Sequence, residues 1–279
     1  MKTRLLTAAV ALPILIASIV LPAYFASTVW LFVAIAAFAL AAGLFEFYSL
    51  SKKLELKADA AVGYIGSAAL FVGFLFDAPA RSPDLLIATL VLILIVLLVT
   101  QTFRFSKDFS KMLTGIGVTM FGIMYVAFLG GFLISTRVGF ENTPGLSTDL
   151  LSYFFLVLFG SDAGAYFTGR ALGKHKLAPS ISPGKTVEGM IGAIVVAAGF
   201  GALATFWFFP ELPYQLSIPL ACVLAAVGVL GDLAESAMKR GSKTKDAASI
   251  LPGHGGFLDR LDSLLFGAPI LYYFARFYY

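Results

Sequence analysis

The chain has 279 residues, of which 59% are hydrophobic and 13% are charged, and its mean hydropathy is +0.90. About a quarter of the residues in a soluble domain are charged, so this composition excludes an ordinary water-soluble domain and indicates an integral membrane protein. The net charge of +4 would suggest nucleic-acid binding in a soluble protein, but in a membrane protein a basic excess first reports orientation, and we expect no nucleic-acid partner.

Apolar segments that approach the roughly 20 residues needed to cross a bilayer recur along the whole chain. The first follows Lys2 and Arg4, and we interpret it as a retained span, because a second span follows it closely without a convincing cleavage site. We therefore predict an all-α polytopic helical bundle, a single membrane-embedded domain over residues 1–279, with N-terminal spans in 1–150 and catalytic spans in 151–279. Nine transmembrane helices are expected, near residues 5–24, 28–48, 61–77, 84–100, 112–135, 149–168, 188–209, 217–237 and 261–276.

Basic residues are concentrated in alternate connections between these segments. With a cytoplasmic N-terminus, every Lys and Arg lies in an inside segment except Arg81, Arg137 and Arg276. The positive-inside rule therefore predicts an odd number of spans and a cytoplasmic N-terminus. We expect the functional residues on the cytoplasmic face.

The eighth segment ends in a row of polar residues. Asp232, Glu235, Ser236 and Lys239 are spaced i, i+3, i+4 and i+7, which places them on one face of a helix. A carboxylate near the hydrocarbon boundary is costly unless it is paired, metal-bound or facing water. The alternative to a functional role for Asp232 is a structural ion pair with Lys239 or Arg240.

The last segment opens with two acids, Asp259 and Asp262, at i and i+3. Acids in a first helical turn are also ordinary dipole complements and caps. Asp232 and Asp259, however, approach the same cytoplasmic end from adjacent helices, and facing carboxylates repel each other unless a cation lies among them. Mg²⁺ suits such a site because it takes few carboxylates and keeps positions for water and phosphate oxygens. We predict Asp232 and Asp259 as metal ligands.

Cations and glycines surround these acids. Metal-bound carboxylates ringed by Lys and Arg are what phosphoryl or nucleotidyl transfer needs, because the cations neutralise charge on the phosphates and the leaving group. The alternative for any single basic residue is topology or lipid headgroup binding. The candidate catalytic residues in this cluster are Lys239, Arg240, Lys245, His254, Arg260 and Asp262.

A second polar loop follows the sixth segment and reads "SDAGAYFTGRALGKHKLAPSISPGKTVEG". Its "GKT" is not a P-loop, because the first glycine of that motif would fall at Pro179. We interpret the loop as an anion cradle, against the alternative of a simple basic interfacial loop. Together with residues near the C-terminal acids, the candidate substrate-binding residues are Asp162, Arg170, Lys174, Lys176, Ser182, Lys185, Thr186, Ser236, Gly255 and Gly256.

The stretch "SAMKRGSKTKDAASILPGHGGFLDRLD", residues 236–262, resembles the signature of phosphatidate cytidylyltransferases, also called CDP-diacylglycerol synthases. The resemblance implies the conversion of CTP and phosphatidate to CDP-diacylglycerol and pyrophosphate at a bacterial cytoplasmic membrane, with the active site facing the cytoplasm. It adds Asp246 as a candidate catalytic residue, since Asp246 fills a fixed position of the signature. It implies Mg²⁺ held by acids matching Asp232 and Asp259, with a second, monovalent cation such as K⁺ as an option. The partners it implies are CTP, phosphatidate and membrane lipid, and it leaves room for a homodimer.

Two other functions fit parts of the pattern. A CTP-dependent lipid kinase, acting on a polyprenol or phytol, would transfer the γ-phosphoryl group instead. A transporter could also bury acids between spans, but its binding site is expected near the bilayer midplane between repeated halves. The acids here lie at one edge, and no second half resembles the first, so we favour the cytidylyltransferase.

Overall fold

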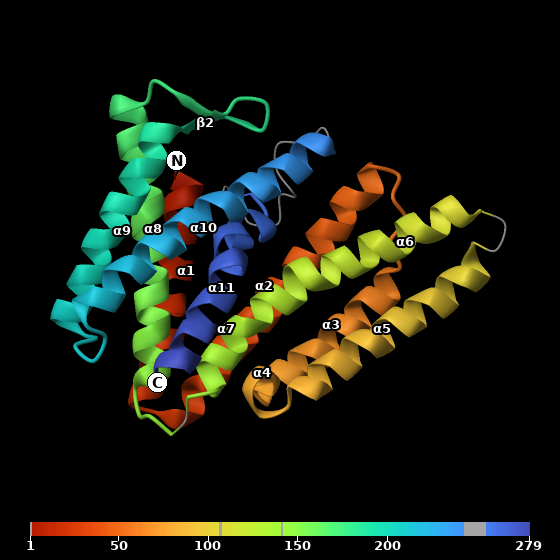
Figure 1. Cartoon of the computed structure of the whole chain (residues 1–279), viewed down its shortest axis with the longest axis horizontal. Helices are drawn as coiled ribbons and strands as arrows, with labels where there is room; N and C mark the ends of the chain where they lie inside the picture. Colours follow the sequence, from red (N-terminus) through yellow and green to blue (C-terminus); the bar gives the residue numbers. More distant parts are fainter. Residues whose placement is uncertain (1, 106–107, 141, 243–254) are drawn as a thin grey trace.

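The computed structural model describes residues 2–105, 108–140, 142–242 and 255–279, with side chains from residue 9 onward. The described chain is a bundle of helices with one small β-hairpin (Figure 1). The helices are α1 (Lys2–Val20), α2 (Val29–Lys53), α3 (Ala60–Leu75), α4 (Ala78–Arg81), α5 (Pro83–Arg104), α6 (Phe109–Gly122), α7 (Leu129–Val138), α8 (Leu146–Leu172), α9 (Val187–Trp207), α10 (Tyr214–Gly241) and α11 (Leu258–Tyr278). Short 3₁₀ turns at Leu21–Ala23 and Ala26–Thr28 join α1 to α2, and a π-helical segment, Ile123–Phe128, joins α6 to α7.

Within the described residues, a helix lies at the place of each predicted apolar segment, so the predicted all-α membrane fold is confirmed. A helix satisfies every backbone hydrogen bond within one segment, which is what a bilayer interior requires. Helix α11 and the shorter helices near Ala9–Ala23 and Ala60–Leu75 do not meet the length and hydropathy expected of a full span, so the predicted number of spans and the orientation stay predictions. Six helical elements meet both: Ala26–Lys53, Pro83–Arg104, Phe109–Val138, Leu146–Leu172, Val187–Trp207 and Tyr214–Gly241.

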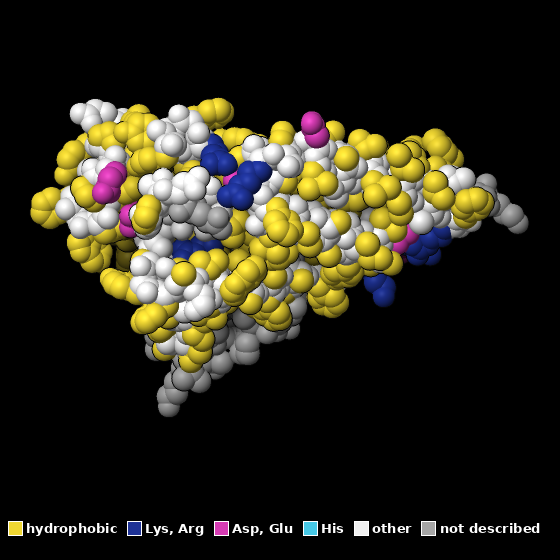
Figure 2. Space-filling model, turned by 90° about the horizontal axis from the view of Figure 1, so that it is seen from below, with side chains coloured by type: hydrophobic (Ala, Val, Ile, Leu, Met, Phe, Trp, Pro, Cys, Tyr) yellow, Lys and Arg dark blue, Asp and Glu magenta, His cyan; other side chains and the backbone are white. Residues whose placement is uncertain are grey.

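Large apolar side chains cover the outside of the molecule. Helix α5, for example, exposes Ile87, Val91 and Leu92, and Figure 2 shows hydrophobic side chains over most of one face, with charged groups in a few places. Soluble monomers rarely expose contiguous apolar patches beyond a few hundred Å². The surface therefore matches a lipid environment, and the chain is an integral membrane protein.

Helix α11 connects the two sides of the bundle. Helices α8, α9, α10 and α11 pack on one another in that order, and α11 also packs against α7 and α2. Figure 1 shows α3, α4 and α5 on the far side, away from α8, α9 and α10. The polar first turns of α11 therefore lie between residues from the first and the second half of the chain.

A two-stranded antiparallel hairpin follows α8, where the sequence predicted only a loop. Strand β1 (Lys176–Ala178) pairs with β2 (Ser182–Thr186), with Lys176 opposite Thr186. Helix α9 begins directly after β2, because the Thr186 hydroxyl accepts a hydrogen bond from the backbone N–H of Gly189 at 3.1 Å and caps the helix. The hairpin is thereby joined to the start of α9, and β2 also contacts α10.

Candidate active site

Three carboxylates converge where α10 and α11 meet. Asp232 and Glu235 lie one turn apart on α10, and Asp262 lies on α11; each offers a carboxylate oxygen, and these oxygens all lie within 4.8 Å of one another. Glu235 is fully buried, and its Oε1 has no hydrogen-bond donor among the described residues. Convergent carboxylate oxygens, one of them buried without a donor, fit a hard cation such as Mg²⁺. The group can therefore hold a metal ion.

Two lysines from different elements flank these acids. Lys239, one turn after Glu235 on α10, places its Nζ 2.5 Å from Glu235 Oε2. Lys185 of β2 places its Nζ 2.6 Å from Asp232 Oδ2. The site thus combines acids that can bind a metal with cations that can bind phosphate oxygens, which is the arrangement that phosphate chemistry requires.

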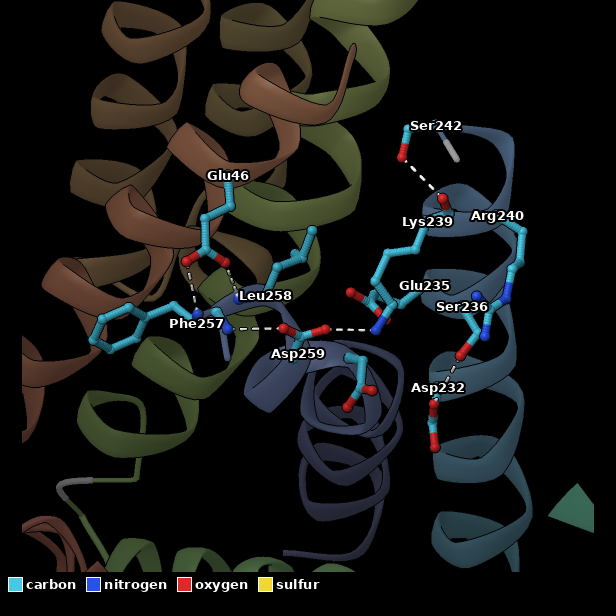
Figure 3. Close-up of polar contacts among 12 residues, drawn as sticks. Glu46, Asp232, Glu235, Ser236, Lys239, Arg240, Ser242, Phe257, Leu258 and Asp259 are labelled. Atoms are coloured by element: carbon cyan, nitrogen blue, oxygen red, sulfur yellow. Dashed lines mark hydrogen bonds and ion pairs between the residues drawn. The ribbon is translucent and has the colours of Figure 1, made fainter. Parts of the chain in front are cut away.

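Asp259 lies beside this group and makes different contacts. Its Oδ1 accepts from Lys239 Nζ at 2.5 Å, and its Oδ2 accepts from the backbone N–H of Gly256 at 2.8 Å. Figure 3 shows Asp259 between the start of α11 and Lys239. The prediction that Asp259 is a metal ligand stays a prediction. In the present geometry Asp259 fixes the lysine that contacts Glu235.

A cavity of about 420 Å³ opens beside Asp232, bounded by α8, α9, α10 and the hairpin. Its volume falls in the range of roughly 300–1,000 Å³ that small-molecule sites occupy. The polar sequence-predicted residues that line it are Asp162, Arg170, Lys185, Thr186 and Asp232. Residues of the polar loop after α8 and Asp232 of α10 therefore line one cavity, and Asp232 connects this cavity to the group of acids.

Other predicted residues lie around this cavity without lining it. Arg240 donates from Nε to the carbonyl of Ile181 at 3.0 Å and so ties α10 to the tip of the hairpin. The Ser236 hydroxyl donates to Asp232 Oδ1 at 3.3 Å. Lys174 and Lys176 are exposed, and Ser182 is half-buried at the start of β2. Their predicted contacts with substrate stay predictions.

Steric constraints explain why glycine occurs at both positions before α11, Gly255 and Gly256. Gly255 has a φ of +81°, which favours glycine, and a Cβ there would lie 2.8 Å from Asp259 Oδ2. A Cβ on Gly256 would overlap the carboxylate of Glu46, which comes from α2. Both glycines therefore allow acids to approach the start of α11, and their predicted contact with substrate stays a prediction.

Known proteins match this chain over most of its length. The cytidylyltransferase family matches residues 2–278. A phosphatidate cytidylyltransferase of Bacillus subtilis is 34% identical over 241 residues, which are 84% of this chain and 85% of that protein. Proteins of the same name from Haemophilus influenzae and Staphylococcus haemolyticus are 40% and 42% identical over 153 and 152 residues, each match covering about half of both chains.

The chain belongs to the cytidylyltransferase family. The family that the resemblance of residues 236–262 indicated is thereby confirmed. Three of the candidate catalytic residues from that signature, Lys245, Asp246 and His254, lie outside the described residues. Arg260 lies in the first turn of α11, next to Asp259.

Three residues of this family member were not assigned a site role from the sequence. Glu235 shares a helical face with Asp232, so the spacing contained the signal. Glu46 of α2 contacts the start of α11, and no spacing links residues so far apart. Tyr125 lies in the π-helical segment, 5% exposed, and its hydroxyl has no hydrogen-bond partner among the described residues. It lies within electrostatic range of Asp262 and Glu235.

Proposed function

We propose that this protein condenses CTP with phosphatidate to form CDP-diacylglycerol and pyrophosphate. The observation that carries the proposal is the acid group of Asp232, Glu235 and Asp262, flanked by Lys185 and Lys239 and in contact with the cavity through Asp232 and Lys185. It occurs in a family member whose relatives are named phosphatidate cytidylyltransferases. The membrane-embedded fold supports the proposal, because one substrate is a lipid.

The reaction forms one bond and breaks one. An oxygen of the phosphatidate phosphate attacks the α-phosphorus of CTP, and the bond from that phosphorus to the bridging oxygen of the β-phosphate breaks. Pyrophosphate leaves with the electron pair. The attacking phosphate is already ionised near neutral pH, since the second pKa of a phosphate monoester is about 6, so the protein does not need a strong general base. Its main tasks are to align two anionic substrates and to balance their charge.

Lysines from two elements supply positive charge on either side of the reacting phosphates. Lys185, which lines the cavity, is placed to bind phosphate oxygens of CTP. Lys239 is held between Glu235 and Asp259 and supplies charge at the α10–α11 end. Groups fixed in advance stabilise the charge of the transition state without reorganising during the reaction.

Asp232, Glu235 and Asp262 would hold Mg²⁺, with Asp259 as a further candidate. When bound there, the ion would supply Lewis-acid stabilisation of phosphate charge. The chain's own residues orient the nucleotide in the cavity and hold α10 and α11 at a fixed spacing. We place the site on the cytoplasmic side of a bacterial membrane, since CTP is a cytoplasmic metabolite and the basic residues gather on this side of the predicted topology.

Product analysis tests the proposal. Purified protein is incubated with phosphatidate vesicles, Mg²⁺ and CTP labelled at either the α- or the γ-phosphate. We expect the α-label in a CDP-lipid and the γ-label in pyrophosphate. Transfer of the γ-label to a lipid alcohol offered in place of phosphatidate would indicate a lipid kinase instead, and the absence of any product under every divalent cation tried would contradict both enzymes.

A further inference from the structure

A buried acid from the first half of the chain binds the start of helix α11. Glu46 of α2 has an exposed fraction of 0%. Its Oε1 accepts a hydrogen bond from the backbone N–H of Phe257 at 2.9 Å, and its Oε2 accepts one from the N–H of Leu258 at 2.7 Å. Figure 3 shows the carboxylate directed at the first turn of α11. Both carboxylate oxygens thus accept hydrogen bonds from residues more than 200 positions away in the sequence.

These contacts meet a need of the helix. The first N–H groups of an α-helix have no acceptor within the helix, and the helix dipole favours a negative charge at that end. The side chain of Phe257, the N-cap residue of α11, can accept no hydrogen bond, and no side chain at the N-cap position caps the helix. Glu46 supplies the missing acceptors from a neighbouring helix. A buried carboxylate is in turn stable only when donors surround it.

The contacts continue from Glu46 into the active site. Asp259, in the first turn of α11, accepts a hydrogen bond at Oδ2 from the backbone N–H of Gly256 and another at Oδ1 from Lys239 Nζ. Lys239 then contacts Glu235, one of the three converging acids. A continuous series of contacts therefore links Glu46, through the start of α11, to the acids on α10.

We propose that Glu46 is a positioning residue of the active site, which fixes the first turn of α11 so that its acids meet those of α10 at the spacing a metal ion requires. This role for Glu46 rests on the proposed function, because one of its tests measures the formation of CDP-diacylglycerol. Partners that hold metal-binding carboxylates in place commonly change metal affinity or activity by about 10- to 100-fold when they are removed. Glu46 itself touches no reacting atom.

The opposite end of α11 offers a matched control. Asp77 is also a buried acid from the first half of the chain, with an exposed fraction of 1%. Its Oδ1 accepts from the Tyr272 hydroxyl at 2.5 Å, and its Oδ2 accepts from Arg276 Nη2 at 2.7 Å. Asp77→Asn and Glu46→Gln each remove one buried charge that holds α11. Only Glu46→Gln lies next to the acids of the active site.

The experiment compares wild type, Glu46→Gln, Asp77→Asn and Gly256→Ala, all purified in the same lipid nanodiscs. Gly256→Ala places a methyl group against the Glu46 carboxylate and disturbs the same contact from the other side. Without Mg²⁺ or nucleotide, hydrogen exchange of the Phe257 and Leu258 amides should quicken by about tenfold in Glu46→Gln, the size expected for a lost helix cap. Asp77→Asn should leave these two amides unchanged.

In the activity assay, we expect the Mg²⁺ concentration for half-maximal turnover to rise by about tenfold in Glu46→Gln and Gly256→Ala, with kcat lowered and the KM for CTP little changed. Asp77→Asn should keep the wild-type Mg²⁺ concentration for half-maximal turnover, even where the variant is less stable than the wild type. Equal Mg²⁺ dependence in Glu46→Gln and Asp77→Asn, or unchanged exchange at Phe257 and Leu258, would overturn the positioning role. A wild type that forms no CDP-lipid would contradict the proposed function instead, while the exchange comparison would still decide whether Glu46 holds α11.

Discussion

Lys185 and Asp232 join the hairpin to helix α10 through an ion pair of 2.6 Å between Nζ and Oδ2. Both residues line the cavity beside the active site. Asp232 is also one of the three acids that can hold a metal ion. A cation and a candidate metal ligand therefore contact each other at the place where CTP is proposed to bind, and the lysine is close enough to reach either the acid or a phosphate.

Replacing Lys185 by Met should lower kcat/KM for CTP strongly while the protein stays folded. Lys185 is half-buried with its Nζ buried beside Asp232, and methionine replaces most of its apolar stem, so little packing is lost, but the proposed charged contact to phosphate disappears. A hydrogen bond to a charged group contributes about 1.5–3 kcal/mol, or roughly 10- to 150-fold in kcat/KM. Steady-state kinetics with varied CTP measure the change.

Lys111→Met is the matched control for Lys185→Met. Lys111 also forms an ion pair with an aspartate, Asp108, at 2.8 Å, but the pair is exposed and belongs to the start of α6. Exposed ion pairs contribute little to stability, so this variant should retain wild-type kinetics. Equal losses in the two lysine variants would contradict a phosphate contact by Lys185.

Asp232→Asn and Glu235→Gln should each remove nearly all activity, by roughly a thousandfold, because several kcal/mol of charge stabilisation depends on the metal site. Both replacements keep the shape of the side chain and reduce the repulsion among the acids, so thermal stability without Mg²⁺ should be retained or increased. Turnover and thermal unfolding are measured on the same samples. Near-wild-type turnover in Glu235→Gln would show that Glu235 is not a ligand of a catalytic metal ion.

Much of the fold could be predicted from the sequence, because in a membrane an apolar run has few options other than a helix. The short strands of the hairpin could not, since "KLA" and "SPGKT" show no apolar alternation over a useful length. The sequence predicted that Asp232 and Asp259 meet at a shared helix end, whereas the structure brings Asp262 to Asp232. Which acids converge depends on the rotation of α10 and α11 about their axes, and the sequence spacing within one helix does not determine the rotation of another.

Contacts between the two halves of the chain were beyond sequence reasoning. Glu46 could be placed near the end of a span, but nothing in its neighbourhood shows that it binds the N–H groups of Phe257 and Leu258. The same holds for Asp77 and Arg276 at the other end of α11. The sequence motif that includes Gly256 was read as a substrate contact, and only the packing reveals the acid against which this glycine lies.

Lys239 and Asp259 should behave as a coupled pair. Their side chains contact each other at 2.5 Å, so Asp259→Asn removes one of the two acids that hold Lys239, the other being Glu235, and Lys239→Met leaves Asp259 without its cation. If Asp259 acts only by holding Lys239, the double variant should be no worse than Lys239→Met alone, with a coupling energy of about 0.5–3 kcal/mol. Turnover of the four proteins gives this cycle. A double variant impaired by the product of both single losses would instead support Asp259 as an independent metal ligand, as the sequence predicted.

Thr186→Val should destabilise the protein by about 1 kcal/mol, the usual cost of losing a helix N-cap. The hydroxyl caps α9 through Gly189, and valine keeps the shape of the side chain without the acceptor. Thr186→Ser keeps the acceptor and should retain most of the stability, as measured by thermal unfolding.

Removing the hydroxyl of Tyr125 should affect activity without a loss of stability. Tyr125→Phe breaks no hydrogen bond within the described residues, and the ring packing against Phe121 and Phe266 is kept. Stability should therefore be equal or slightly higher, because a buried hydroxyl without a partner is costly. π-Helical segments are often found at functional sites, and this one carries the hydroxyl into range of Asp262 and Glu235. If the hydroxyl donates a hydrogen bond to an anionic group of the bound substrates, turnover should fall by about tenfold in Tyr125→Phe, the value of one hydrogen bond to a charged group. Full turnover in Tyr125→Phe, with raised thermal stability, would mean that the hydroxyl takes no part in the reaction.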